Sequence, residues 1–146
     1  MIKRMTISDY ESIFELWKST PDLGLRRWDD SKEGIHCFLK RNPNTSFVAY
    51  EDGRIVGTIL SGHDGRRGYI YHTVVLGEYR RKGIASNLVK MAVEALKEEG
   101  ITRVCLNIKE TNEQGKSFWI SKGWERKEFL GFYSKGITDK ENSPVR

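Results

Sequence analysis

The stretch YIYHTVVLGEYRRKGIA, residues 69–85, decides the fold, because a strand pattern turns there through basic residues and a glycine into a helix. The apolar run Tyr69–Leu76 predicts a buried strand. Backbone N–H groups in the first turn of a helix have no partners within the helix, and the helix dipole adds about half a positive charge there. Gly83 has no Cβ, so an anion can approach the backbone closely, and three basic residues add positive charge: Arg80, Arg81 and Lys82. The stretch therefore predicts a phosphate-binding site between a strand and a helix.

The N-terminal half of the chain predicts two helices followed by an antiparallel hairpin. Ser8–Glu11 is a capping box with apolar residues at helical spacing after it, and Asp30–Glu33 begins a second helix. Ser46–Tyr50 and Arg54–Gly62 are β-branched and apolar runs, and the Asp52-Gly53 pair between them is a strong hairpin signal. A meander of antiparallel strands therefore leads into the strand of the opening stretch.

The C-terminal half predicts a parallel strand, a further helix and late strands. Arg103–Ile108 is a short apolar run after the long amphipathic helix, so a right-handed crossover makes it parallel to the preceding strand. Thr111–Gln114 is another capping box. Residues 124–137 alternate loosely and predict one or two more strands, whereas residues 138–146 are polar and predict a frayed tail. We therefore expect a single domain over residues 1–137, with the tail outside it.

Composition limits the class of protein. A chain of 146 residues with 38% apolar residues is long enough for one globular core. It has no apolar run of about 20 residues and no signal-peptide segment near its start, which predicts a cytoplasmic protein with no membrane partner. The net charge of +5 suits an anionic cofactor, an acidic substrate or nucleic acid, but no nucleic-acid-binding motif accompanies it.

The two cysteines predict buried free thiols. Cys37 and Cys105 lie in apolar-patterned segments and lack the spacing of metal ligands. Because the three histidines are scattered as well, the sequence predicts no metal site.

Three motifs in register resemble the GCN5-related N-acetyltransferase (GNAT) superfamily over nearly the whole chain. Arg80-x-x-Gly83-x-Ala85 matches the pyrophosphate motif, and Thr73-Val74-Val75 matches the fourth strand, whose backbone binds the pantetheine arm in that family. The segment from Asn112 to Trp124 matches the pattern N-x-x-[AG]-x-x-[LF]-Y-x-x-x-G-[FW] except at the tyrosine. The resemblance implies an α/β GNAT fold: a mixed, mostly antiparallel sheet, a parallel pair of fourth and fifth strands splayed at the cofactor cleft, and helices on both faces.

The resemblance also implies an activity and a cofactor. A GNAT protein transfers the acetyl group of acetyl-CoA to a primary amine by direct attack in a ternary complex. The acceptor is a protein N-terminus, a lysine, a polyamine or another small amine, and relatives often form homodimers through their late strands. The residues implied to bind coenzyme A (CoA) are Thr73, Val74, Val75, Arg80, Arg81, Lys82, Gly83, Ile84, Ala85, Ser86, Asn112 and Trp119.

The sequence departs from the family pattern at two positions, so we predict other residues as the general base and the general acid. Trp119 stands where relatives carry a tyrosine that is the proposed general acid, and Asn107 stands where several carry a glutamate. An indole N–H does not release its proton at physiological pH, and an amide is no base. We predict His72 as the base, because an imidazole titrates near neutrality, with Tyr71 relaying a proton and Tyr133, on a late strand, replacing the missing acid. The alternative for each is a structural role within the sheet and core.

The loop between the first two predicted helices is the predicted acceptor site, because the same loop lines the acceptor pocket in relatives. It contains Arg26, Arg27, Trp28 and Asp29, and we predict Arg27, Trp28 and also Tyr71 as substrate-binding residues. The alternative is a packed tryptophan flanked by solvated arginines. Two other functions stay open: a CoA-binding module that has lost catalysis, for which the two departures argue, and a nucleic-acid-binding protein that uses the basic excess.

Overall fold

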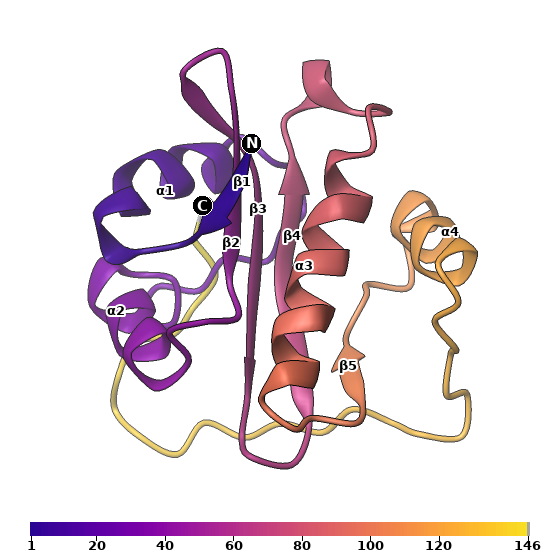
Figure 1. The fold of residues 1–146 in the computed structure, drawn as a ribbon. Coiled ribbons are helices and arrows are strands. Elements are labelled where there is room, and N and C mark those ends of the chain that lie inside the picture. Colours follow the sequence, from indigo (N-terminus) through magenta and orange to yellow (C-terminus); the bar gives the residue numbers. More distant parts are fainter. Residues whose placement is uncertain (146) are drawn as a thin grey trace. The chain divides into compact units, whose positions relative to one another are not determined.

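The computed structural model describes residues 1–145, which divide into two compact units. The larger unit contains residues 1–106 and the chain end from Glu141 onward, and the smaller unit contains Asn107–Lys140. The sheet and the three helices that cover it belong to the larger unit (Figure 1).

A five-stranded mixed sheet forms the centre of the larger unit. Its strands lie side by side in chain order: β1 (Ile2–Arg4), β2 (Phe47–Glu51), β3 (Arg54–His63), β4 (Gly68–Val75) and β5 (Val104–Leu106). All neighbouring strands are antiparallel except β4 and β5, which are parallel. Helix α3 (Ile84–Glu98) connects that parallel pair. The predicted meander and the predicted mixed sheet are confirmed.

Helices cover both faces of the sheet, as predicted. Neighbouring residues of a strand point to opposite faces. Trp17 of α1 (Tyr10–Lys18) donates from Nε1 to Oγ1 of Thr58 in β3 at 3.0 Å, whereas a Cβ on the adjacent Gly57 would lie 3.2 Å from the side chain of Ile84 in α3. Helices α1 and α3 therefore lie on opposite faces of β3. Helix α2 (Lys32–Arg41) packs into the same core as α1 (Figure 1).

Apolar side chains at helical spacing hold these helices on the sheet. Burying a side chain the size of leucine stabilises the fold by about 1.5–3 kcal/mol. The core under α1 and α2 contains Ile13, Leu16, Trp17, Ile35, Leu39, Val48, Leu60 and Val74. On the other face, α3 buries Leu88, Ala92 and Leu96.

A β-bulge in β4 turns two successive side chains toward one face. The ladder with β3 has one residue, Leu60, opposite two residues of β4, Tyr71 and His72. The extra residue interrupts the alternation of side chains along β4. Tyr71 and His72 consequently line the same cavity, together with residues of α2.

The parallel pairing of β4 with β5 stops after three residues, where β5 ends. Strand β5 pairs with Gly68, Tyr69 and Ile70 of β4. Beyond them, no strand in the described part of the chain pairs with the same edge of β4, from Tyr71 to Val75. We call this segment the open edge of β4, and it leads directly into the predicted phosphate loop.

The smaller unit contains helix α4 (Glu113–Ser121) and no strand among its residues. Asn112 precedes the helix, and its Oδ1 accepts a hydrogen bond from the Gly115 N–H at 2.8 Å. Residues 124–137 form no strand, so the predicted late strands are wrong. Four consecutive charged residues, 125–128, interrupt the loose alternation of this segment, so its apolar side chains do not form one continuous face for strand pairing.

Two expectations about other segments also differ from the structure. Instead of fraying, residues 142–145 are hydrogen-bonded to residues 25–29. Cys37 is exposed rather than buried, because the apolar side of α2 is formed by Ile35 and Leu39, while the thiol of Cys105 is half-buried and both thiols are free. Within residues 1–145, the length and hydropathy of every helix fall short of what a membrane-spanning segment needs.

Candidate functional site

The loop between β4 and α3 presents a run of unpaired backbone amides. The first amide bonded into α3 is that of Asn87, which donates to the Gly83 carbonyl at 3.0 Å. The N–H groups of residues 81–86 have no acceptor among the described groups. Gly83 adopts a φ of +81°, in the left-handed region, and no atom lies within 4 Å of the place where a Cβ would be. The loop therefore offers open space in front of free N–H groups, which suits a phosphate.

Side chains tie this loop to the turn between β2 and β3. The Tyr79 hydroxyl donates to Oδ2 of Asp52 at 2.6 Å, and this hydrogen bond raises the pKa of Tyr79. The Arg54 guanidinium and the Lys82 ammonium lie 5.5 and 5.2 Å from the centre of the Tyr79 ring. Arg54 also forms an ion pair with Glu78. Positive charge is therefore held around the loop by the aromatic ring.

The open edge of β4 carries polar groups that lack partners. Leu76 donates its N–H to the Val56 carbonyl of β3 at 2.8 Å. Because hydrogen bonds alternate along an antiparallel ladder, the backbone groups of Thr73 and Val75 point away from β3. Arg80 reaches the Val75 carbonyl there, from Nε at 3.1 Å. Oγ1 of Thr73 is buried with no hydrogen-bond partner among the described residues, so this edge can accept an extended polar ligand.

At the other end of the open edge, His72 is held by a carboxylate. Its Nε2 lies 2.7 Å from Oδ1 of Asp30, and the two side chains are 13% and 5% exposed. A carboxylate accepts hydrogen bonds, so Nε2 carries the proton in the neutral imidazole and Nδ1 keeps its lone pair. The Trp17 ring packs edge-on against the imidazole, with 4.7 Å between ring centres. His72 is therefore fixed in one orientation and one tautomer.

Asp30 is itself held in place by two neighbours. Its Oδ2 accepts the Arg26 N–H at 2.7 Å, and its backbone carbonyl accepts the Tyr10 hydroxyl at 2.7 Å. Burial, followed by the charge of Asp30, raises the pKa of Tyr10 to about 12, so this hydroxyl stays a donor at neutral pH. The sequence pattern identified Asp30 as a helix start, but the cap is Ser31, whose Oγ accepts the Gly34 N–H at 3.0 Å. No local signal marked Asp30 as a partner of a histidine that follows 42 residues later.

A cavity of about 360 Å³ opens beside His72 and Asp30. Burial raises the pKa of the Tyr71 hydroxyl in its wall, and the nearby Tyr69 and Asp29 raise it further. Phe38 of α2 meets the Tyr71 ring edge-on, with 5.8 Å between ring centres. The lining residues are Gly24, Arg26, Trp28, Asp29, Asp30, Gly34, Ile35, Phe38, Leu60, Tyr71 and His72.

Arg27, predicted to bind substrate, is not among the residues that line this cavity. Its Nε pairs with Glu141 Oε2 at 3.1 Å and donates to Ser143 Oγ at 2.9 Å. Oδ1 of Asn142 accepts the N–H groups of both Trp28 and Asp29, at 3.2 and 3.1 Å. The C-terminal segment therefore holds the backbone of the cavity loop, and Arg27 belongs to that contact.

The remaining predicted site residues are distributed as follows. Val74 is buried in the core under α1 and α2, and it lies opposite Thr58 of β3, so its backbone groups face β3 rather than the open edge. In the smaller unit, Asn112 caps α4, and Trp119 packs edge-on against Trp124 with 4.9 Å between ring centres. Tyr133 is 93% exposed and lies outside any helix or strand, so its predicted place on a late strand is wrong.

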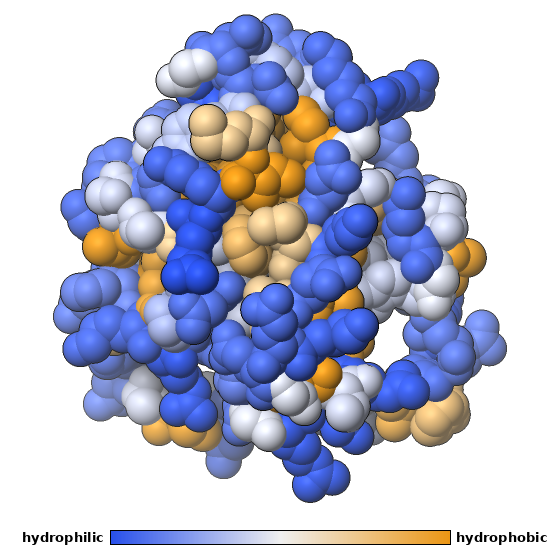
Figure 2. Space-filling model, viewed as in Figure 1, coloured by the Kyte–Doolittle hydropathy of each residue, from blue (hydrophilic) through white to orange (hydrophobic). Residues whose placement is uncertain are grey.

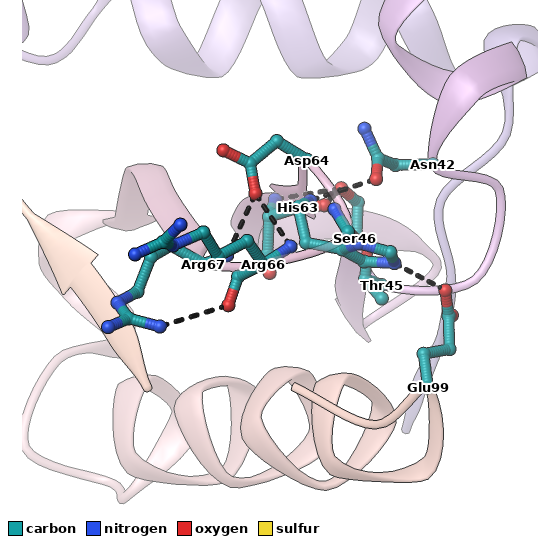
Figure 3. A network of polar contacts seen from close by, with 10 residues as sticks. Asn42, Thr45, Ser46, His63, Asp64, Arg66, Arg67 and Glu99 are labelled. Carbon is teal, nitrogen blue, oxygen red and sulfur yellow. Dashed lines mark hydrogen bonds and ion pairs between the residues drawn. The ribbon is translucent and has the colours of Figure 1, made fainter. Parts of the chain in front are cut away.

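A second histidine–carboxylate pair lies at the far end of the β3–β4 hairpin (Figure 3). His63 Nε2 is 2.7 Å from Glu99 Oε1, and Asn42 Oδ1 accepts the His63 N–H at 2.9 Å. Nearby, the Arg67 and Arg66 N–H groups lower the pKa of the Asp64 carboxyl, to which both donate. This network is absent from the cavity lining and closes a turn, so we regard it as structural.

A second hollow, of about 430 Å³, lies between β1 and α3. Figure 2 shows apolar side chains gathered near the middle of the face of the molecule that it draws. Its lining includes Met1, Ile2, Ala49, Ile84 and Met91, and contains no histidine, cysteine, serine or tyrosine. Its charged lining residues are Glu51, which pairs with the N-terminal ammonium at 3.9 Å, and Lys90.

Comparisons with known proteins agree with this geometry. Residues 9–124 match the model of the acetyltransferase (GNAT) family. An acetyltransferase of Pectobacterium atrosepticum is 30% identical over 133 residues, which cover 91% of this chain and 93% of that protein. Two solved structures share the fold. The PaiA N-acetyltransferase of Thermoplasma acidophilum, in complex with coenzyme A, has a TM-score of 0.75 at 21% identity, covering 97% of this chain and 94% of that chain. An aminoglycoside antibiotic N-acetyltransferase of Acinetobacter haemolyticus has a TM-score of 0.71 at 20% identity, covering 94% and 99%. The match of residues 9–124 to the family model and the 30% identity to a relative over 91% of the chain establish that the chain belongs to the acetyltransferase (GNAT) family.

Proposed function

We propose that this protein is an acetyl-CoA-dependent N-acetyltransferase that acetylates a primary amine by direct attack, acting in the cytoplasm. One observation carries the proposal. The open edge of β4 runs without a strand partner, among the described residues, from the carboxylate-bound His72 to the loop of free amides at residues 81–86. A ligand that binds the loop through phosphates and follows the edge reaches the histidine.

The chain's polar groups fit CoA along this path. The amides of residues 81–86 and the charges of Arg80, Arg81 and Lys82 would hold the pyrophosphate. The outward backbone groups of Thr73 and Val75, with the unpartnered Oγ1 of Thr73, would hold the pantetheine arm. The CoA complex of the structurally similar PaiA protein supports this assignment.

Two side chains in the cavity would move the protons of the reaction. Bound acetyl-CoA supplies a thioester carbonyl carbon. His72 accepts, through Nδ1, the proton that the amine loses as its nitrogen bonds to that carbon. Tyr71, a phenol that carries its proton at neutral pH, would donate that proton to the sulfur as the C–S bond breaks. N–H groups of the open edge stabilise the charge on the carbonyl oxygen, an effect of about 2.7–4 kcal/mol per donor in other enzymes.

Other residues remain part of the proposal without a step of their own. Asn112 and Trp119 stay CoA-binding residues on the family resemblance alone, and Tyr133 is a second choice for the proton donor. We keep residues 1–137 as the catalytic domain and a homodimer as the assembly that the family resemblance implies.

The test measures thiol release from acetyl-CoA with a panel of primary amines. We expect turnover with at least one amine, and we expect His72→Gln to lower kcat by about 10²–10⁴, the usual contribution of a general base. His63→Gln is the matched control, since His63 also binds a carboxylate at 2.7 Å but lies at the other end of the hairpin, and it should retain activity (Figure 3). Tight CoA binding without turnover of any amine would instead support a CoA-binding module.

A further inference from the structure

The cavity beside His72 is lined by apolar side chains and by charged side chains. Trp28, Phe38 and Tyr71 supply aromatic surface, and Leu60, which is 4% exposed, also lines the cavity. Aromatic faces attract a single ammonium group and pack against an apolar body. The volume, about 360 Å³, lies at the small end of the range for ligand sites. The walls therefore favour a small acceptor with an apolar carbon skeleton.

The lining of the cavity contains three charged side chains, Arg26, Asp29 and Asp30. Both carboxylate oxygens of Asp30 are already bonded, one to His72 and the other to the Arg26 N–H. The Asp29 carboxylate has no ion-pair or hydrogen-bond partner within residues 1–145, and its charge is felt at Tyr71. The Arg26 guanidinium, which also lines the cavity, is likewise unpaired within the described chain. The cavity thus offers one free negative and one free positive group.

We infer that the acceptor is a compact primary amine with one positive charge and an aromatic or branched aliphatic body, and that polycationic amines are excluded. This inference rests on the proposed function. Asp29 and the aromatic rings accommodate one ammonium group. A second ammonium would lose its water against apolar walls without a free carboxylate, and it would meet the positive charge of Arg26. Polyamines and aminoglycosides carry several such groups.

The experiment compares kcat/KM for phenethylamine, spermidine and kanamycin at saturating acetyl-CoA. We expect phenethylamine to exceed both polycations by about tenfold or more. A higher kcat/KM for spermidine or kanamycin would overturn the inference and leave the proposed function intact. Failure of every amine, with thiol release also absent for short peptides, would instead count against the proposed function.

A charge reversal tests the same inference within one protein. Arg26→Glu converts the free positive group into a second free carboxylate, so the ratio of kcat/KM for spermidine to that for phenethylamine should rise by about tenfold or more. Arg66→Glu makes the same change in the β3–β4 turn, outside the cavity lining, and should leave the ratio unchanged. An equal ratio in both variants would contradict a role for the cavity charges.

Discussion

Replacing Asp30 with Asn keeps the size of the side chain but presents a hydrogen-bond donor to His72 in place of an acceptor. The Arg26 N–H is a fixed donor, so the amide oxygen of Asn must face it and the amide NH₂ must face Nε2 of His72. The imidazole then has to carry its proton on Nδ1, where the proposed base needs a lone pair. We expect kcat to fall by about 10²–10⁴, since an equivalent tautomer change in a serine protease costs about 10⁴.

Nitrogen chemical shifts of the imidazole provide the decisive measurement for Asp30→Asn. They should report the Nε2–H tautomer in the parent protein and the Nδ1–H tautomer in the variant, whereas a merely structural role would leave the tautomer unchanged. Asp30→Ala separates the two effects, because it removes the carboxylate without imposing the wrong tautomer. If Asp30→Asn retained both its tautomer and its kcat, Asp30 would have no positioning role.

Sequence reasoning reached His72 but not its partner, and the reason is the range of the contact. An imidazole within a predicted strand can be found from residue type alone, whereas the pair with Asp30 depends on how the loop before α2 folds over β4. The choice between Arg26 and Arg27 is of the same kind. Both were assigned to the acceptor loop, but the contact of Arg27 with Glu141 depends on residues more than 100 positions away.

At the scale of elements, the C-terminal segment acts as a strap on the cavity loop. We predict that Asn142→Ala raises KM for the amine by roughly tenfold, because it removes two hydrogen bonds of about 1 kcal/mol each from the Trp28 and Asp29 amides. The turnover number should change less, since His72 and Asp30 keep their own contacts. Steady-state kinetics with varied amine at saturating acetyl-CoA measures both values.

Asn142→Asp is the control for this strap, because its oxygen can still accept both N–H groups. It should keep KM near the parent value, and a chain ending at Lys140 should resemble or exceed Asn142→Ala. An unchanged KM in the truncated chain would mean that the loop holds its shape unaided.

The spacing of apolar residues predicted an element correctly where the signal for that element lies within its own sequence. The apolar stripes of α1, α2 and α3 and the Asp52-Gly53 hairpin are local signals, and the structure contains each of them. The tail and residues 124–137 were assigned wrongly, because their state depends on partners rather than on local pattern. Residues 142–145 find such partners in the loop at residues 25–29. No strand partner is found for residues 124–137 within the described chain.

At the scale of the whole molecule, ligand binding and folding are linked. The melting temperature, Tm, therefore reports whether a ligand binds the loop between β4 and α3. A ligand that binds only the folded state adds about 2.7 kcal/mol at a hundred times its Kd. For a chain of this length, that corresponds to a rise in Tm of roughly 5–10 °C. We therefore predict that CoA raises Tm by this amount and that an oligonucleotide, the ligand of the nucleic-acid alternative, does not.

Two glycines allow the contribution of the loop to be isolated. Gly83 and Gly65 have φ values of +81° and +89°, and neither has an atom within 4 Å of the place where a Cβ would be. Alanine at either position should cost a similar amount of stability, about 1–3 kcal/mol of backbone strain, without CoA. Only Gly83→Ala places a methyl group where the phosphate must approach the amides, so this variant should lose most of the CoA-induced rise in Tm, while Gly65→Ala should retain it. Equal rises in both variants would show that CoA does not bind at the β4–α3 loop.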